Sequence, residues 1–124
     1  MTAIGATNTL ALADCGSANP HLIKLESWGA KAVQHGAQIN MKFRNNAEKD
    51  VRMVKAKVLF TDPFGEHIAT LSINPDVKCK AGDTFSQSGS YFVDRLANVD
   101  PDDITTTVCV EGVVYSDGEV EQFK

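Results

Sequence analysis

Four carboxylates cluster in residues 94–103, and they are the side chains of this sequence best suited to binding a cation. They are Asp94, Asp100, Asp102 and Asp103. Calcium takes about six to eight oxygen ligands, and loops can supply them, although the spacing of an EF-hand is missing. Acids in loops also stay solvated or cap turns. A calcium-dependent binding domain is therefore an alternative, and no other cofactor is expected.

Histidine and cysteine are the other residue types that could ligate a metal or act as nucleophiles. They are His21, His35, His67, Cys15, Cys79 and Cys109. No two of them have the close spacing of a zinc motif such as CxxC or HxxxH. Cys109 stands between two valines, which suits packing better than attack. A small enzyme therefore remains only an alternative, without a catalytic residue to name. The odd cysteine count allows one disulfide with a free thiol, or three reduced thiols.

Two aromatic residues are candidates for contact with a partner. Trp28 is the sole tryptophan, and tryptophan is enriched among the residues that dominate interface energy. Its structural interpretation is a core or sheet-edge aromatic. Phe64 falls in the turn Asp-Pro-Phe-Gly, where a ring is either tucked back or offered to a partner. We predict an unidentified protein as the partner, and edge-strand pairing between copies is a further option.

Charge and length exclude several classes of function. The chain has 124 residues, 12 Lys and Arg, 16 Asp and Glu, and a net charge of −4. Cations are scattered, so the clustered charge that nucleic-acid binding needs is missing. No apolar run approaches the roughly 20 residues of a membrane helix. The length fits one domain that buries a core without a metal or a disulfide.

The elements that would position these residues alternate with period two, which is typical of strands. Residues 39–44 alternate apolar and polar side chains, and residues 54–60 place Val, Ala, Val and Phe on one face. The turn at 62–65 leads into a return strand, in which we expect Ile68 and Leu71 to be buried.

Further strands are predicted at residues 21–28, 84–92, 105–115 and 119–123. The strand at 84–92 is rich in serine, which favours a place near a sheet edge. Residues 94–103 form a loop with a helical turn near Leu96. Seven or so short strands with short links predict an all-β protein, an immunoglobulin-like antiparallel β-sandwich, with a small barrel as the alternative.

A family resemblance begins at the third strand. A polar turn precedes the strand at 51–60, Asp62 follows it, and a Gly82-Asp83 turn precedes Phe85. This arrangement resembles the bacterial FxLYD-type domain, although Val, Phe and Thr replace the Phe, Leu and Tyr of the naming motif. The resemblance implies an immunoglobulin-like sandwich, often in exported proteins, and carries no catalytic site.

We interpret residues 1–20 as an N-terminal arm and residues 21–124 as a single β-sandwich domain. Ala11-Leu12-Ala13 has the small-x-small form of a signal-peptidase site, so the arm could also be the end of a signal peptide. The compartment stays open, with an exported or periplasmic location favoured. The predicted function is a non-catalytic binding or protein-interaction module.

Overall fold

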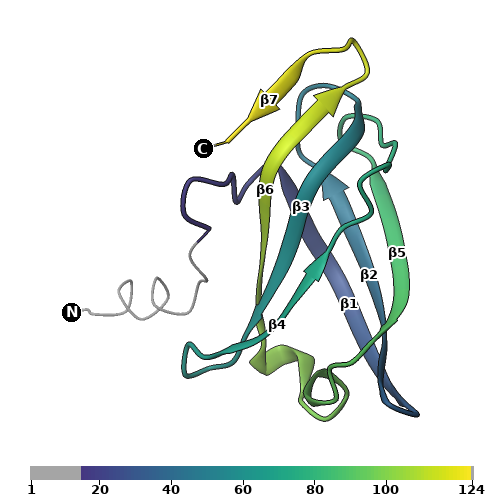
Figure 1. Ribbon diagram of the computed structural model, residues 1–124, viewed down its shortest axis with the longest axis vertical. Helices are drawn as coiled ribbons and strands as arrows, with labels where there is room; N and C mark the ends of the chain where they lie inside the picture. Colours follow the sequence, from purple (N-terminus) through teal and green to yellow (C-terminus); the bar gives the residue numbers. More distant parts are fainter. Residues whose placement is uncertain (1–14, 124) are drawn as a thin grey trace, which may run out of the picture.

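The computed structural model describes residues 15–123, and these residues form seven strands and two 3₁₀ turns (Figure 1). The strands are β1 (Ile23–Val33), β2 (Gly36–Asn45), β3 (Val51–Thr61), β4 (His67–Ser72), β5 (Thr84–Tyr91), β6 (Thr105–Tyr115) and β7 (Val120–Gln122). The 3₁₀ turns are η1 (Arg95–Ala97) and η2 (Pro101–Asp103), both between β5 and β6. No described helix is long and apolar enough to cross a membrane.

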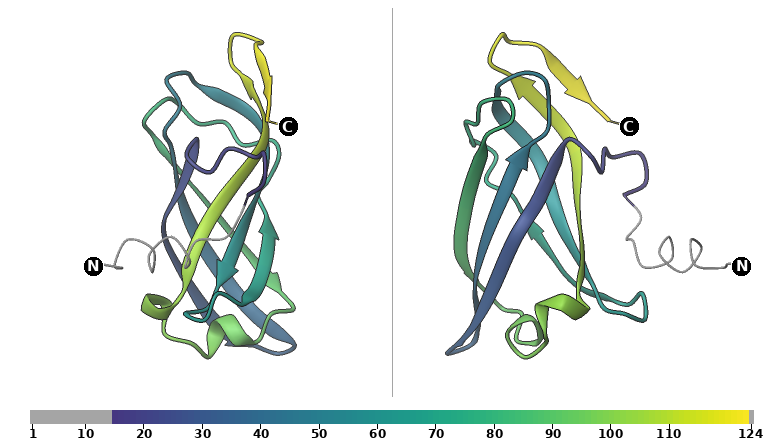
Figure 2. Two further views of the ribbon diagram at one scale, coloured as in Figure 1. Left: turned by 90° about the vertical axis from the view of Figure 1, so that its left-hand side faces the viewer. Right: turned by 180° about the vertical axis from the view of Figure 1, so that it is seen from behind.

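The strands belong to two antiparallel sheets that pack face to face. One sheet has the order β1-β2-β5 and the other has the order β4-β3-β6-β7. The two further views in Figure 2 show the layers with their strands running nearly along the same axis. The all-β prediction is confirmed, and two separate sheets correspond to a sandwich rather than a closed barrel.

The core consists of the inward-facing residues of both sheets. Phe43 and Ile39 of β2 face Phe60 and Val58 of β3, and all four are at most 1% exposed. On β3 the alternating lysines lie outside, as the sequence predicts. The return strand differs in one detail, because Ile68 is only half-buried. Leu71 is buried as predicted. Ala69 takes the other core position in place of Ile68, since alternation turns positions 68 and 71 to opposite faces.

A buried asparagine fixes the connection between the two sheets. Asn45, at the end of β2, is fully buried and makes three side-chain hydrogen bonds. Its Nδ2 donates to the carbonyls of Lys49 and Cys79, and its Oδ1 accepts from the Ala47 amide. The polar turn after β2 is therefore tied to the connection that precedes β5.

The described part of the predicted arm is bonded to the sandwich. Asn19 and Val110 exchange two backbone hydrogen bonds, of 2.8 and 2.9 Å, along the edge of β6. Cys15 forms a disulfide with Cys109, and their Cα atoms are 5.4 Å apart. The Asn19 bridge and the disulfide therefore hold residues 15–20 against β6. The remainder of the arm, with Ala11-Leu12-Ala13, lies outside the described residues.

Candidate interaction surface at the loop end

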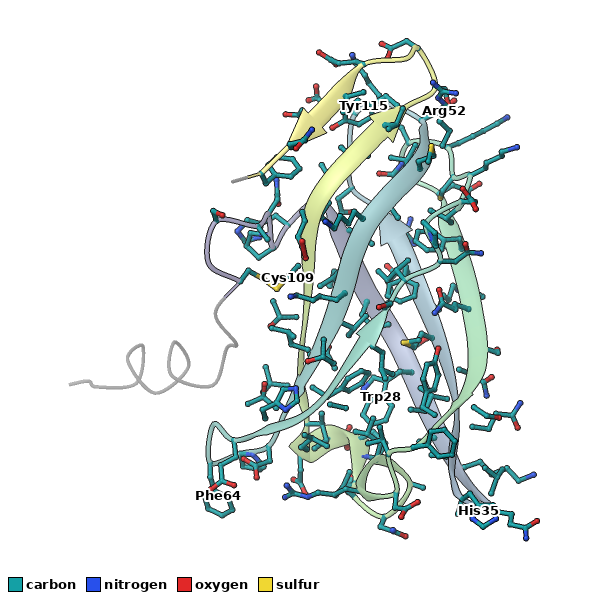
Figure 3. All side chains as sticks on the ribbon, in the orientation of Figure 1. Trp28, His35, Arg52, Phe64, Cys109 and Tyr115 are labelled. Carbon is teal, nitrogen blue, oxygen red and sulfur yellow. A yellow bond between two sulfur atoms is a disulfide. The ribbon has the colours of Figure 1, made fainter. Side chains whose placement is uncertain are left out.

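Three connections meet at one end of the sandwich, which we call the loop end. They are the β1–β2 turn, the β3–β4 turn and the β5–β6 connection with its two 3₁₀ turns. Consecutive strands run in opposite directions, so alternate connections share an end. Figure 3 shows Phe64 of the β3–β4 turn and His35 of the β1–β2 turn at this end.

A buried carboxylate holds two of these connections together. Asp62 is 2% exposed, and its Oδ1 accepts hydrogen bonds of 2.9 Å from the amides of Phe64 and Glu66. Its Oδ2 accepts from the Arg95 guanidinium at 3.1 Å. The Glu66 amide, the Phe64 amide and the Arg95 guanidinium hold the pKa of Asp62 below its ordinary value. The β3–β4 turn and the β5–β6 connection are thus fixed to each other.

A close backbone approach attaches the third connection. Gly36 has a φ of 142°, and a Cβ atom placed there would lie 2.0 Å from the carbonyl oxygen of Tyr91. Only glycine permits this approach. The β1–β2 turn therefore packs directly against the backbone at the end of β5, which continues into Phe92.

Two phenylalanines on this framework point into solvent. Phe64 is 86% exposed and Phe92 is 92% exposed. Gly65, with a φ of 81°, completes the turn that carries Phe64. The Phe64 ring therefore projects from the turn into solvent and does not fold back onto the sandwich. The side chain of Arg95, in the β5–β6 connection of the same loop end, is 52% exposed. The sequence prediction overlooked Phe92, whose position just after the last inward residue of β5 was the available signal.

Trp28 occupies a different environment. Its ring is half-buried and packs edge-on against Phe60, with ring centroids 5.1 Å apart and an interplanar angle of 78°. Figure 3 shows it among the strands, above the turns of the loop end. The tryptophan therefore packs on the core, and its proposed role as a partner anchor stays a prediction.

Of the four acidic residues between β5 and β6, Asp100 has a local structural role through its carboxylate, and Asp94 has one through its backbone carbonyl. Asp100 caps η2, because its Oδ1 accepts a 3.0 Å hydrogen bond from the Asp102 amide. The Asp94 carbonyl accepts from Asn98 Nδ2 at 3.1 Å. Within residues 15–123 no three His, Cys, Asp or Glu side chains are grouped so that they could hold a metal ion. A calcium site at Asp94, Asp100, Asp102 and Asp103 stays a prediction without a supporting contact.

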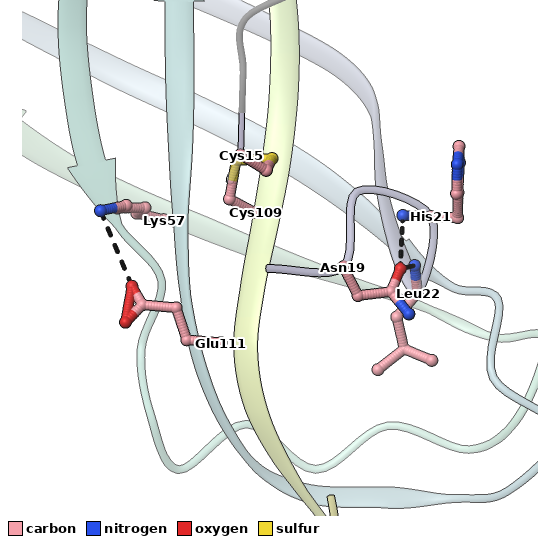
Figure 4. The surroundings of a disulfide bond; sticks show 7 residues. All are labelled: Cys15, Asn19, His21, Leu22, Lys57, Cys109 and Glu111. Atoms are coloured by element: carbon pink, nitrogen blue, oxygen red, sulfur yellow. Dashed lines mark hydrogen bonds and ion pairs between the residues drawn. A yellow bond between two sulfur atoms is a disulfide. The ribbon is translucent and has the colours of Figure 1, made fainter. Parts of the chain in front are cut away.

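The cysteines divide into one disulfide and one thiol. Cys109 faces the outer side of β6 and is covered by its bond to Cys15 (Figure 4). Cys79 is buried and unbridged, and burial raises the pKa of its thiol. Cys15 and Cys109 therefore have no free thiol to act as a nucleophile, and the thiol of Cys79 is held in its neutral form.

A groove of about 810 Å³ lies on the outer face of the four-stranded sheet. The groove is lined by residues of β7 and by Lys55 and Lys57 of β3, among others. Both lysines approach the Glu111 carboxylate, at 3.8 and 3.7 Å, and Figure 4 draws the second of these pairs. The largest exposed apolar rings lie instead at the loop end.

No family model, curated protein or solved structure matches this chain. The resemblance to the FxLYD-type domain therefore stays a prediction.

Proposed function

We propose that this protein is a non-catalytic protein-interaction module that presents its loop end to a protein partner. The observation that carries the proposal is the exposure of Phe64 and Phe92, 86% and 92%, on connections fixed by the buried Asp62. Aromatic residues and arginine are enriched where interfaces gain most of their energy. A rigid support lowers the ordering cost of binding.

The proposed scaffold is an immunoglobulin-like sandwich. The strand orders β1-β2-β5 and β4-β3-β6-β7 support it, because immunoglobulin-type domains likewise join strands one, two and five and pair strands three, six and seven. In variable domains the binding loops join strands two and three and strands six and seven. Here these connections lie at the end opposite the loop end, so the comparison supports the scaffold and not the choice of surface. The disulfide differs from that of immunoglobulin domains, since it joins β6 to the segment before β1.

We place the protein in an oxidising compartment, exported or periplasmic. The Cys15–Cys109 disulfide supports this location, because disulfides persist outside the reducing cytosol. The thiol of Cys79 is compatible with it, since a buried thiol is protected from exchange.

Affinity capture from extracts of the source cells tests the loop-end proposal. The baits are the wild-type chain, Phe64→Ser, Phe92→Ser, and Val120→Ser as the matched control. Val120 is also an exposed apolar residue, at 57%, but it lies in β7 after the β6–β7 turn, at the opposite end.

We expect the wild type and Val120→Ser to capture the same protein in similar amounts. The amount captured by Phe64→Ser should be about tenfold or more lower, the loss typical of a truncated hot-spot side chain. Equal capture by all four baits would exclude the loop end as the contact surface. Purified components and a titration would then give the dissociation constant for each bait.

A further inference from the structure

Strand β5 is a free edge of the three-stranded sheet. It pairs with β2 on one side, and it is the last strand in the order β1-β2-β5. In Figure 1 and in the right-hand view of Figure 2 it runs along the margin of the molecule, and no described segment lies beyond it. Its outer backbone groups are therefore directed at solvent.

The register identifies these outer groups. The Asn45 amide donates to the Asp83 carbonyl at 2.9 Å, so these opposite residues are a hydrogen-bonded pair. Hydrogen-bonded and non-hydrogen-bonded pairs alternate along antiparallel strands. Phe43–Phe85 and Met41–Gln87 are therefore the next hydrogen-bonded pairs between β2 and β5. The residues between them, Thr84, Ser86, Ser88 and Ser90, direct their N–H and C=O groups outward.

Thr84 agrees with this assignment, because its amide donates sideways to Asp83 Oδ1 at 2.9 Å. Its outward donor is therefore satisfied within the chain. The backbone hydrogen bonds formed outside the sheets in residues 15–123 do not involve Ser86, Ser88 or Ser90. These three serines offer both a donor and an acceptor along the edge.

This edge lacks the features that normally prevent strand addition. The eight residues of β5 contain no charge and no proline, and their pairing with β2 has no register shift. The opposite edge, β1, has Lys24, Glu26 and Lys31, and a bulge between Leu25 and Ser27. The edges of the other sheet, β4 and β7, have six and three residues.

We propose that β5 pairs antiparallel with β5 of a second copy, which joins two three-stranded sheets into one of six strands. Two features favour a copy of this chain as the occupant. Each copy has a net charge of −4, and β5 is a neutral strand along which two such molecules can meet without facing charges. The serine pattern is also self-complementary.

A two-fold axis at Ser88 sets Ser88 opposite Ser88 of the second copy and Ser86 opposite Ser90. This register uses all three residues whose outward groups are unpaired, and each pairing exchanges two backbone hydrogen bonds. The serine hydroxyls lie on the solvent face, where cross-strand hydroxyls can bond to one another. The surface is separate from the loop end, so this inference does not depend on the proposed function.

Sedimentation equilibrium of the full chain, from micromolar to millimolar, tests the pairing. The variants are Ser88→Pro, which removes the central outward amide, and Ser88→Thr, which keeps it. Proline is tolerated at outward positions of an edge strand. We expect a dimer for the wild type and Ser88→Thr, and a dissociation constant about tenfold or more higher for Ser88→Pro, which loses two symmetric hydrogen bonds. A monomeric wild type, or an unchanged dimer for Ser88→Pro, would overturn the proposal.

A cross-linking measurement keeps the proposal testable if Ser88→Pro does not fold. In the proposed register Ser88→Cys faces itself across the axis, with Cα atoms about 5.5 Å apart, within disulfide range. Ser86→Cys is the matched control, because its two copies would lie more than about 10 Å apart. Mild oxidation should cross-link Ser88→Cys but not Ser86→Cys. Equal cross-linking, or none with Ser88→Cys, would contradict the register, and Phe64→Ser should leave the result unchanged.

Discussion

At the scale of single residues, two buried polar side chains organise the ends of the sandwich. Asn45 and Asp62 are 0% and 2% exposed, and each serves a turn rather than a ligand. The asparagine uses both its donor and its acceptor, whereas the carboxylate only accepts. Removing either side chain leaves the buried or half-buried groups that it bonds without a partner, which costs more than the hydrogen bond itself contributes.

Asp62 makes the stability of the fold depend on pH in the acid range. Its folded-state pKa is lowered, so its contribution is fully present above its unfolded pKa of about 4 and is lost as the pH falls through the folded value. We expect Asp62→Asn to lower the melting temperature by about 5 °C at neutral pH. The difference from the wild type should shrink below about pH 4. Thermal melts from neutral to acid pH measure both effects.

Asp76→Asn is the matched control for this series. Asp76 is exposed in the connection between β4 and β5, so its variant should follow the wild-type curve at each pH. A constant difference between Asp62→Asn and the wild type down to the lowest pH would contradict the assignment. It would mean that the variant loses packing rather than a carboxylate.

At the scale of elements, the β1–β2 hairpin depends on the glycine that begins β2. Gly36→Ala would place a Cβ against the Tyr91 carbonyl in a left-handed backbone conformation. We expect a loss of about 2–3 kcal/mol in the free energy of unfolding, because a backbone atom cannot move aside easily. Urea denaturation measures it.

Gly29→Ala, in the same hairpin, is the control. A Cβ at Gly29 would meet no atom within 4 Å, so this change should leave stability equal or raise it by about 0.4–1 kcal/mol through the unfolded state. Equal losses for the two variants would show that the approach of β5 to Gly36 is not what constrains the hairpin.

Alternation explains why the sequence predicts some elements better than others. In β3, buried Val54 and Val58 alternate with exposed lysines, and this local pattern is sufficient for the strand. The serine-rich β5 was expected at a sheet edge, and it is one. The register shifts between β3 and β6 arise from pairing between distant segments, which a period-two pattern does not encode.

The candidate surface was predictable only in part. Phe64 stands out in sequence because an aromatic is unusual in a Pro-Gly turn, and it is exposed. Phe92 gave a weaker signal, since an aromatic at the end of a strand equally fits the core. The pairing of Cys15 with Cys109 across 94 residues follows from the path of the segment before β1. The cysteine spacing left that pairing open.

At the scale of the whole molecule, the disulfide attaches the segment before β1 to the middle of β6. Cross-linking over 94 residues restricts the unfolded chain, which typically contributes about 2–4 kcal/mol to stability. We expect Cys15→Ser with Cys109→Ala to lose about this amount in urea denaturation. Wild-type stability should fall on adding a reductant, whereas that of the double variant should not change.

Thiol titration separates this loss from a packing defect at Cys109. Unfolded without reductant, the wild type should show one reactive thiol, that of Cys79, and after reduction it should show three. In the native state Cys79 should react slowly, because it is 7% exposed. Three thiols without reductant would contradict the disulfide and remove the support for an oxidising compartment. The loop end would be unaffected, because it is held by Asp62, Arg95 and Gly36 at the far ends of the strands.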